Sequence, residues 1–341
     1  LLGADTDFSA AIVKNPVFTT AYIYRALTRT RMGNYDDALQ DFREAIDLRP
    51  DLPDAYYSRG YTRLQNKQYE EAIEDFDKFI FQENKVADAY IGRGTAYLYL
   101  KDTVRALENF DQAIRTNREN PNGYYQRGTL LLQKEEYARA EADFDMSIRC
   151  DSAFLPPYFN RAVVYSNTNR PMQALADFDR VLQLDSTNSF TYFNRAILRT
   201  QIGDYNRALD DFDRVALYSP GNVQVYYLRA MLKTRLGDLE GAERDYTRAI
   251  ELYPDFANAY LNRSALRYAL HNPKAAKRDE EIAQRKIAEY KSHLKDSTYS
   301  IYADTTQRMD KLLAFDNQFT NNYFDRISEQ PSLGRSNMRL L

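Results

Sequence analysis

The 341-residue sequence has no tryptophan, one cysteine, two histidines and only 12 glycines. The single cysteine, Cys150, excludes a framework of internal disulfides, although it fits either a reducing or an oxidising compartment. Neither His271 nor His293 has a cysteine or histidine at zinc-binding spacing, and the sequence contains no phosphate-binding glycine loop or nucleophile elbow. We therefore expect no metal site, no cofactor and no enzymatic activity.

The sequence also lacks long apolar runs and a strong charge of either sign. No run approaches the roughly 18 apolar residues that a membrane-spanning helix needs. The formal net charge is −3 and the pI is about 5.7, so no overall positive field attracts nucleic acid or an anionic membrane. We expect neither nucleic-acid binding nor membrane insertion.

Aromatic residues are abundant instead, with 28 tyrosines and 18 phenylalanines, and many of them follow a strict period. The 34-residue period is set by an arginine that recurs at Arg25, Arg59, Arg93, Arg127, Arg161, Arg195, Arg229 and Arg263. A tyrosine stands three positions before each of these arginines, from Tyr22 to Tyr260, and a small residue directly follows each one. Internal periods of this length are typical of repeat proteins.

Each unit also has an alanine thirteen positions after the arginine, and an aromatic residue four positions later in seven of eight units. Apolar positions three and four apart, on both sides of a short polar break, predict two helices per unit. The break contains Gly33, Gly203 or Gly237 in three units, where glycine ends one helix in a left-handed conformation. A single hairpin cannot bury its apolar face alone, so neighbouring hairpins are expected to stack.

These features resemble the tetratricopeptide repeat, in a bacterial type. The resemblance covers residues 17–294 and implies an all-α, right-handed α-solenoid of about eight 34-residue helix-turn-helix repeats with a C-terminal capping helix. Residues 1–16 match the second helix of a preceding, truncated repeat. Residues 295–341 leave the period, and we expect a partly helical tail that docks on the array.

An acidic residue repeats with the same period, sixteen positions after seven of the eight arginines. The hairpin turn lies midway between the two, so in an antiparallel pair of helices they stand at the same level. We therefore expect an ion ladder, with an amide at Asn109 replacing the carboxylate opposite Arg93. The alternative is that these charges are solvated on the surface. The predicted pairs are Arg25 with Asp41, Arg59 with Asp75, Arg127 with Asp143, Arg161 with Asp177, Arg195 with Asp211, Arg229 with Asp245, and Arg263 with Asp279.

The resemblance also implies a binding surface, because in this family the first helix of each repeat lines a concave groove. In this sequence the corresponding positions are mainly apolar and aromatic, which departs from a clamp for a C-terminal carboxylate. The expected partner-binding residues are Tyr57, Tyr61, Ile91, Tyr99, Tyr125, Phe159, Phe193 and Tyr227. The alternative is that these side chains pack between helices, since such stripes are usually core.

The sequence thus favours a scaffold that binds a protein or peptide segment in this groove. A structural or self-associating spacer in a larger assembly, as in a homo-oligomer, is the alternative. The bacterial type of the resemblance favours the periplasm or cell envelope slightly over the cytoplasm.

Overall fold

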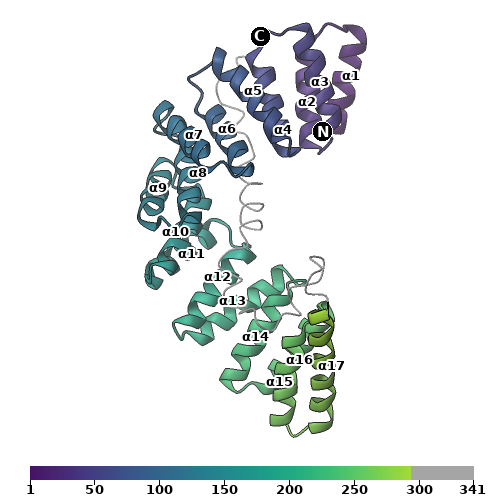
Figure 1. Cartoon of the computed structure of the whole chain (residues 1–341), viewed down its shortest axis with the longest axis vertical. Helices are drawn as coiled ribbons and strands as arrows, with labels where there is room; N and C mark the ends of the chain where they lie inside the picture. The colour runs from purple at the N-terminus through teal and green to yellow at the C-terminus, as the bar shows by residue number, and fades with distance from the viewer. Residues whose placement is uncertain (293–341) are drawn as a thin grey trace. The chain divides into compact units, whose positions relative to one another are not determined.

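The structure is a computed structural model that describes residues 1–292, and all of its regular elements in that range are helices (Figure 1). The described chain divides into two compact units, residues 1–160 and the residues from 161 onward, and the boundary falls within α10 (Pro156–Asn167). The fold class expected from the sequence, an α-solenoid built from repeated helical hairpins, is confirmed. The expected tail, residues 295–341, and His293 lie outside the described residues.

Unit 1 contains a leading helix and four complete hairpins, followed by the start of α10. Consecutive helices pack against each other, both within a hairpin and from one hairpin to the next. Their bounds are α1 (Leu2–Lys14), α2 (Thr19–Arg31), α3 (Tyr35–Leu48), α4 (Pro53–Gln65), α5 (Tyr69–Gln82), α6 (Ala87–Tyr99), α7 (Thr103–Thr116), α8 (Pro121–Gln133) and α9 (Tyr137–Cys150).

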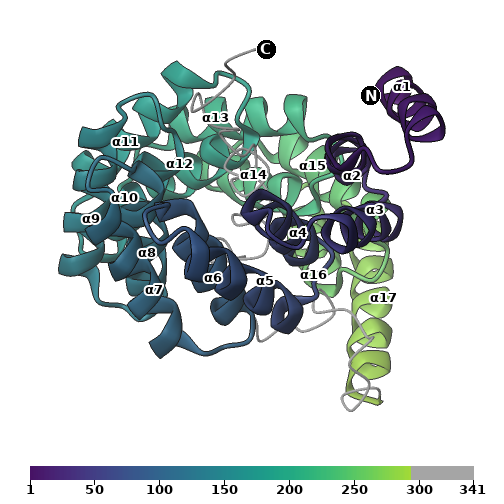
Figure 2. The ribbon, with the colours of Figure 1, turned by 90° about the horizontal axis from the view of Figure 1, so that it is seen from above.

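Unit 2 continues with the same alternation of first and second helices (Figure 2). The second helices of the whole described chain begin at 34-residue intervals, from Tyr35 to Pro273, as the arginine period predicts. The bounds are α11 (Pro171–Leu184), α12 (Ser189–Gln201), α13 (Tyr205–Tyr218), α14 (Val223–Leu236), α15 (Leu239–Leu252), α16 (Ala257–Ala269) and α17 (Pro273–Ser292).

The turns between paired helices require one residue in the left-handed conformation. Gly33, Gly203 and Gly237 adopt it with φ of 79°, 85° and 85°, as expected from the sequence. Five other turns use a residue with a side chain at the same place: Lys67, Lys101, Glu135, Asn169 and His271. Glycine therefore marks only some of the turns, because the positions of the two helices impose this backbone conformation even where it is less favourable.

The periodic alanines and aromatic residues form the core of each unit. The recurrent phenylalanines from Phe42 to Phe212 and the alanines from Ala38 to Ala276 are almost completely buried. The small residue after each arginine lets the paired helices approach, since a Cβ atom on Gly94 would lie 2.7 Å from the ring of Phe110. Within each unit first helices also pack on the preceding second helix, as α4 does on α3 and α16 does on α15, so the core continues from one of these hairpins to the next.

The recurrent tyrosines have a buried or half-buried ring, and in four of them the hydroxyl group forms a hydrogen bond with the backbone. The hydroxyl groups of Tyr56, Tyr90, Tyr158 and Tyr226 each donate to a backbone carbonyl six positions earlier, at 3.2 Å. In most units the guanidinium group of the recurrent arginine lies over the same ring, 5.4–5.6 Å from its centroid. Tyrosine suits this place because its ring is buried while its hydroxyl stays paired.

Candidate functional site

The recurrent arginines and the acidic residues sixteen positions later meet inside each hairpin. In seven hairpins the arginine donates from Nε and Nη2 to both carboxylate oxygens, at 2.6–2.9 Å. In the remaining hairpin Arg93 donates to the side-chain oxygen of Asn109 at 2.7 Å. Two parallel bonds to one carboxylate fix both distance and orientation, so each pair sets the level of one helix against its partner.

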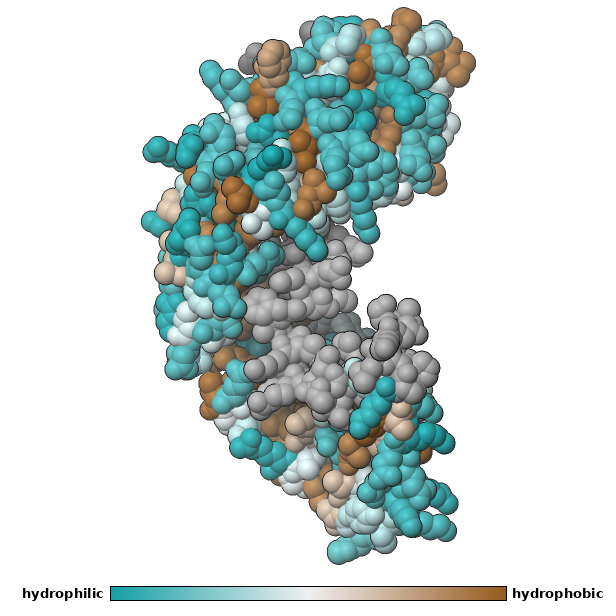
Figure 3. All heavy atoms as spheres, in the orientation of Figure 1, coloured by the Kyte–Doolittle hydropathy of each residue, from teal (hydrophilic) through white to brown (hydrophobic). Residues whose placement is uncertain are grey.

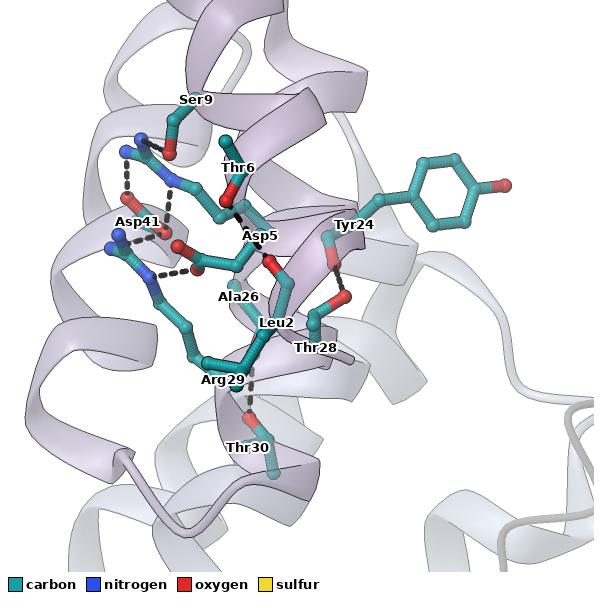
Figure 4. A network of polar contacts seen from close by, with 11 residues as sticks. Leu2, Asp5, Thr6, Ser9, Tyr24, Ala26, Thr28, Arg29, Thr30 and Asp41 are labelled. Carbon is teal, nitrogen blue, oxygen red and sulfur yellow. Dashed lines mark hydrogen bonds and ion pairs between the residues drawn. The ribbon is translucent and has the colours of Figure 1, made fainter.

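A second cation shares most of these carboxylates. One turn after the recurrent arginine, Arg29, Arg63, Arg199, Lys233 and Arg267 each contact the same aspartate, at 2.7–2.9 Å. Figure 4 shows the first of these sites, where Asp41 and Asp5 both face Arg29 while Tyr24 points away from the network. Two hairpins have Tyr97 and Leu131 at the position of the second cation. In these hairpins the acceptors, Asn109 and Asp143, each bond a single arginine.

A further set of carboxylates connects four of the hairpins to the hairpin before them. The free Nη1 of the arginine reaches back sixteen positions along the chain, from Arg93 to Asp77 at 2.5 Å, from Arg127 to Asp111 at 2.6 Å, and from Arg229 to Asp213 at 2.8 Å. Arg195 and Asp179 form the same contact. Three of these aspartates end an Asp-Phe-Asp segment, and Asp111 ends the matching Asn-Phe-Asp segment. The ladder predicted from the sequence gives them no partner. The sequence signal that could have predicted these contacts is that each aspartate stands sixteen positions before a recurrent arginine.

The two kinds of carboxylate differ in burial. Asp75 and Asp143, which bond within a hairpin, are buried, whereas the side chains of Asp77 and Asp213 are 53% and 63% exposed. The pKa of Arg127 is raised, first by its hydrogen bonds to Asp143, against the opposing effect of burial. The buried carboxylates thus neutralise arginines held inside the stack, and the exposed ones add contacts between neighbours at lower desolvation cost.

The residues expected to contact a partner lie mostly inside the stack. Tyr57 and Tyr61 are half-buried and Tyr99 is 44% exposed. The other five expose less than a tenth of their surface. They are Ile91, Tyr125, Phe159, Phe193 and Tyr227. The alternative of packing between helices describes these five better than direct partner contact does.

The aromatic rings form edge-on clusters that join neighbouring helices. Tyr61 meets the buried ring of Phe76 with centroids 5.1 Å apart, and Tyr57 lies 5.0 Å from Tyr61. The hydroxyl of Tyr61 donates to the carbonyl of Asp88 on α6 at 2.8 Å, which connects one hairpin to the next. In unit 2, Asn262 donates to the hydroxyl of Tyr227 at 3.0 Å. These rings therefore have a structural role on the first helices. We call the residues Tyr57, Tyr61, Tyr125, Phe159, Phe193 and Tyr227 the aromatic floor.

The first helices still carry exposed side chains one or two turns beyond these rings. Tyr99 and Gln133 are exposed in unit 1, and Gln201, Met231 and Arg235 are exposed in unit 2. The face drawn in Figure 3 is mostly hydrophilic, with apolar side chains in small groups. Amide, guanidinium, thioether and phenol groups supply hydrogen bonds and adaptable apolar contact, the chemistry that binds an extended peptide.

Residues 1–292 meet the requirements of neither a metal site nor a membrane-spanning helix. Among them, no group of three or more histidine, cysteine, aspartate or glutamate side chains could hold a metal ion. Over the same range, none of the helices combines the length and apolar character that crossing a bilayer requires. Cys150 lies at the end of α9, where its thiol donates to the carbonyl of Arg118 and burial raises its pKa.

Buried tyrosines make the fold sensitive to alkaline pH. Burial raises the pKa of Tyr57, Tyr61 and Tyr227, whereas an unfolded tyrosine titrates near pH 10. Their contribution to stability is complete below about pH 10 and is lost as the pH rises toward the folded-state values. We expect the urea midpoint to fall steeply above about pH 10. Tyr57→Phe should flatten that fall, while Tyr24→Phe, a surface change, should not; equal profiles for all three proteins would contradict this account.

Three family models match separate parts of the sequence. One described as "TPR repeat" matches residues 26–67, and two described as "Tetratricopeptide repeat" match residues 91–153 and 223–256. Each matched segment lies in the array of hairpins that carries the ion ladder. The chain belongs to the tetratricopeptide repeat proteins. Among curated proteins, none matches this sequence.

Solved structures with the same fold are similar to large parts of the chain. A tetratricopeptide repeat protein from Parabacteroides merdae is 18% identical, with a TM-score of 0.52 over 78% of this chain and 98% of its own. The C-terminal part of a TPR repeat-containing protein from Cytophaga hutchinsonii is 17% identical, with a TM-score of 0.55 over 69% and 96%. PilF of Pseudomonas aeruginosa is 21% identical, with a TM-score of 0.54 over 59% and 92%. At these identities the likeness describes the fold alone.

Proposed function

We propose that this chain is a scaffold that binds a peptide segment of another protein along the first helices of its hairpins. Tetratricopeptide repeats generally serve as scaffolds for protein–protein interaction. The observation that carries the proposal is the combination, on the first helices, of a buried aromatic floor with exposed side chains such as Tyr99, Gln133 and Met231. A rigid floor keeps the exposed groups at fixed positions, which lowers the entropy lost on binding.

The binding surface differs in one respect from the groove that the sequence suggests. The partner meets the exposed groups, whereas Tyr125, Phe159 and Phe193 expose less than a tenth of their surface and lie inside the stack. Substitution of the three buried aromatics therefore acts first on stability and only through it on binding. Substitution of Tyr99, 44% of whose surface is exposed, removes contact area from the surface together with one ring stack on Tyr69.

A random peptide library displayed on phage, selected against the full chain, tests this proposal. We expect enriched peptides whose affinity falls about ten-fold or more in Tyr99→Ser or Met231→Ser, the loss that removal of a central aromatic or thioether contact causes. Phe81→Ser is the matched control, because Phe81 is 91% exposed but lies on α5, a second helix. Peptides that bind Tyr99→Ser and Met231→Ser as well as the parent chain, or that lose affinity only in Phe81→Ser, would contradict the proposal.

A further inference from the structure

Unit 1 contains a cavity of about 320 Å³ that the proposed peptide surface does not use. It lies between the second helix α3, the next first helix α4 and the beginning of α5. Three arginines line it, together with two glutamines and a single acidic residue. The polar lining residues are Asp36, Gln40, Arg43, Arg59, Arg63 and Gln68.

The cavity lies where an arginine–aspartate contact between neighbouring hairpins is missing. In four other places the recurrent arginine bonds an aspartate sixteen positions earlier, such as Asp77 or Asp213. For Arg59 that earlier position is Arg43, so a cation stands where these four places have a carboxylate. Arg25 and Arg263 bond a hydroxyl group at the same position, that of Ser9 and of Thr247. Within the described residues, Arg59 bonds Asp75 through Nε and Nη2, and its Nη1 has no carboxylate within hydrogen-bond distance.

The local charges leave a positive surplus in this cavity. Arg59 and Arg63 share the one buried carboxylate of Asp75, at 2.7 Å from each. Arg43 adds a third guanidinium group, and the acidic lining residue Asp36 is exposed to solvent. Like charges held close together raise the free energy of the folded chain unless an anion lies between them.

The remaining donors converge from three elements. Arg43 is exposed, and the available N–H groups of Arg59 and Arg63 face the same cavity from α4. Gln68 is the N-cap of α5, and within the described residues its side-chain NH2 group donates no hydrogen bond to the protein, so it is available to an anion. The N-terminus of α5 adds a partial positive charge at this end of the cavity. Forked guanidinium groups and amides in this arrangement match an anion with several oxygen atoms.

We propose that this cavity binds a phosphate group, either free phosphate or a phosphomonoester. A phosphate near pH 7 carries a charge of about −1.5 to −2 and offers three or more acceptor oxygens, which corresponds to the surplus charge and the several donors. The site restores, by a ligand, the negative charge that Asp77 or Asp213 supplies elsewhere in the stack. It lies on α3, α4 and the start of α5, and it is independent of the exposed residues proposed for peptide binding.

Equilibrium dialysis of the full chain with labelled inorganic phosphate, at constant ionic strength set with chloride, tests the site. Arg43→Asp places a carboxylate sixteen positions before Arg59, as Asp77 stands before Arg93. We therefore expect the phosphate affinity of this variant to fall about ten-fold or more, as loss of charge-assisted bonds implies. Its melting temperature without phosphate should rise above that of the parent chain. Phosphate should raise the melting temperature of the parent chain but not that of Arg43→Asp.

Two further variants make the result specific. Arg115→Asp makes the same change in net charge at an exposed position of α7 outside the cavity, and it should bind phosphate like the parent chain. Arg43→Gln removes the guanidinium fork without adding a carboxylate and should also weaken binding. O-phosphoserine in a second arm separates a phosphomonoester from free phosphate, and tighter binding of either supports the site. Equal phosphate binding by the parent chain and Arg43→Asp, or none by the parent chain beyond chloride, would overturn the proposal.

Discussion

Replacing Asp75 by asparagine is expected to lower the free energy of unfolding by about 3 kcal/mol. Asp75 is completely buried and accepts hydrogen bonds from both Arg59 and Arg63, at 2.7–2.9 Å. Asparagine keeps the shape but removes the charge, so two arginines inside the stack lose their only shared carboxylate. Urea unfolding followed by far-UV circular dichroism measures the change.

Asp77 provides the matched control two positions later. It bonds Arg93 but its side chain is 53% exposed, so the same substitution should cost less than about 1 kcal/mol. Arg63→Tyr should recover part of the loss in Asp75→Asn, because the chain itself places Tyr97 beside the Arg93–Asn109 pair. Equal losses at Asp75 and Asp77, or no recovery in the double variant, would show that charge matching does not govern the ladder.

Gly92→Leu is expected to destabilise unit 1 by about 3 kcal/mol through overpacking. A Cβ atom at Gly92 would lie 2.5 Å from Cζ of Phe76, whose buried ring also packs against Tyr61. The ring cannot retreat without displacing that tyrosine and breaking its hydrogen bond to Asp88. Urea unfolding again provides the measurement.

The corresponding position of another repeat holds Leu228, so the first helix by itself accommodates leucine there. The expected loss therefore comes from the neighbouring ring. Phe76→Ala should open space for the new side chain, so the double variant should lose less stability than the sum of the two single changes. Additive losses would place the cause in the backbone of α6 instead of in its contact with Phe76.

The hairpins and the pairs inside them could be predicted from the sequence because both depend on spacing alone. The 34-residue period fixes the helix starts, and the midpoint of the hairpin turn places Arg127 and Asp143 at the same level. The contact from Arg127 to Asp111 depends instead on how one hairpin sits on the next. The ladder predicted from the sequence uses only the spacing within a hairpin, so it does not include contacts of this second kind.

Burial of the groove aromatics was harder to predict, since helical periodicity shows which face is apolar but not what covers it. Tyr125 contacts the ring of Phe154 from the following connection, and Tyr227 lies 4.7 Å from Phe256 in the same way. These covering residues precede the next first helix and lie outside the periodic pattern of the predicted groove. The left-handed turns at Lys67 and Glu135 were missed for a related reason, because packing imposes them where no glycine marks the place.

A partner is expected to lie along the first helices, on their exposed side chains, and not along the second helices. Photo-crosslinking tests this most directly, with p-benzoylphenylalanine placed at Tyr99 on α6 in one chain and at Phe81 on α5 in another. Both side chains are exposed, so either position can react with a bound peptide selected from the library. We expect crosslinks from position 99 and none from position 81; crosslinks from position 81 alone would contradict the account.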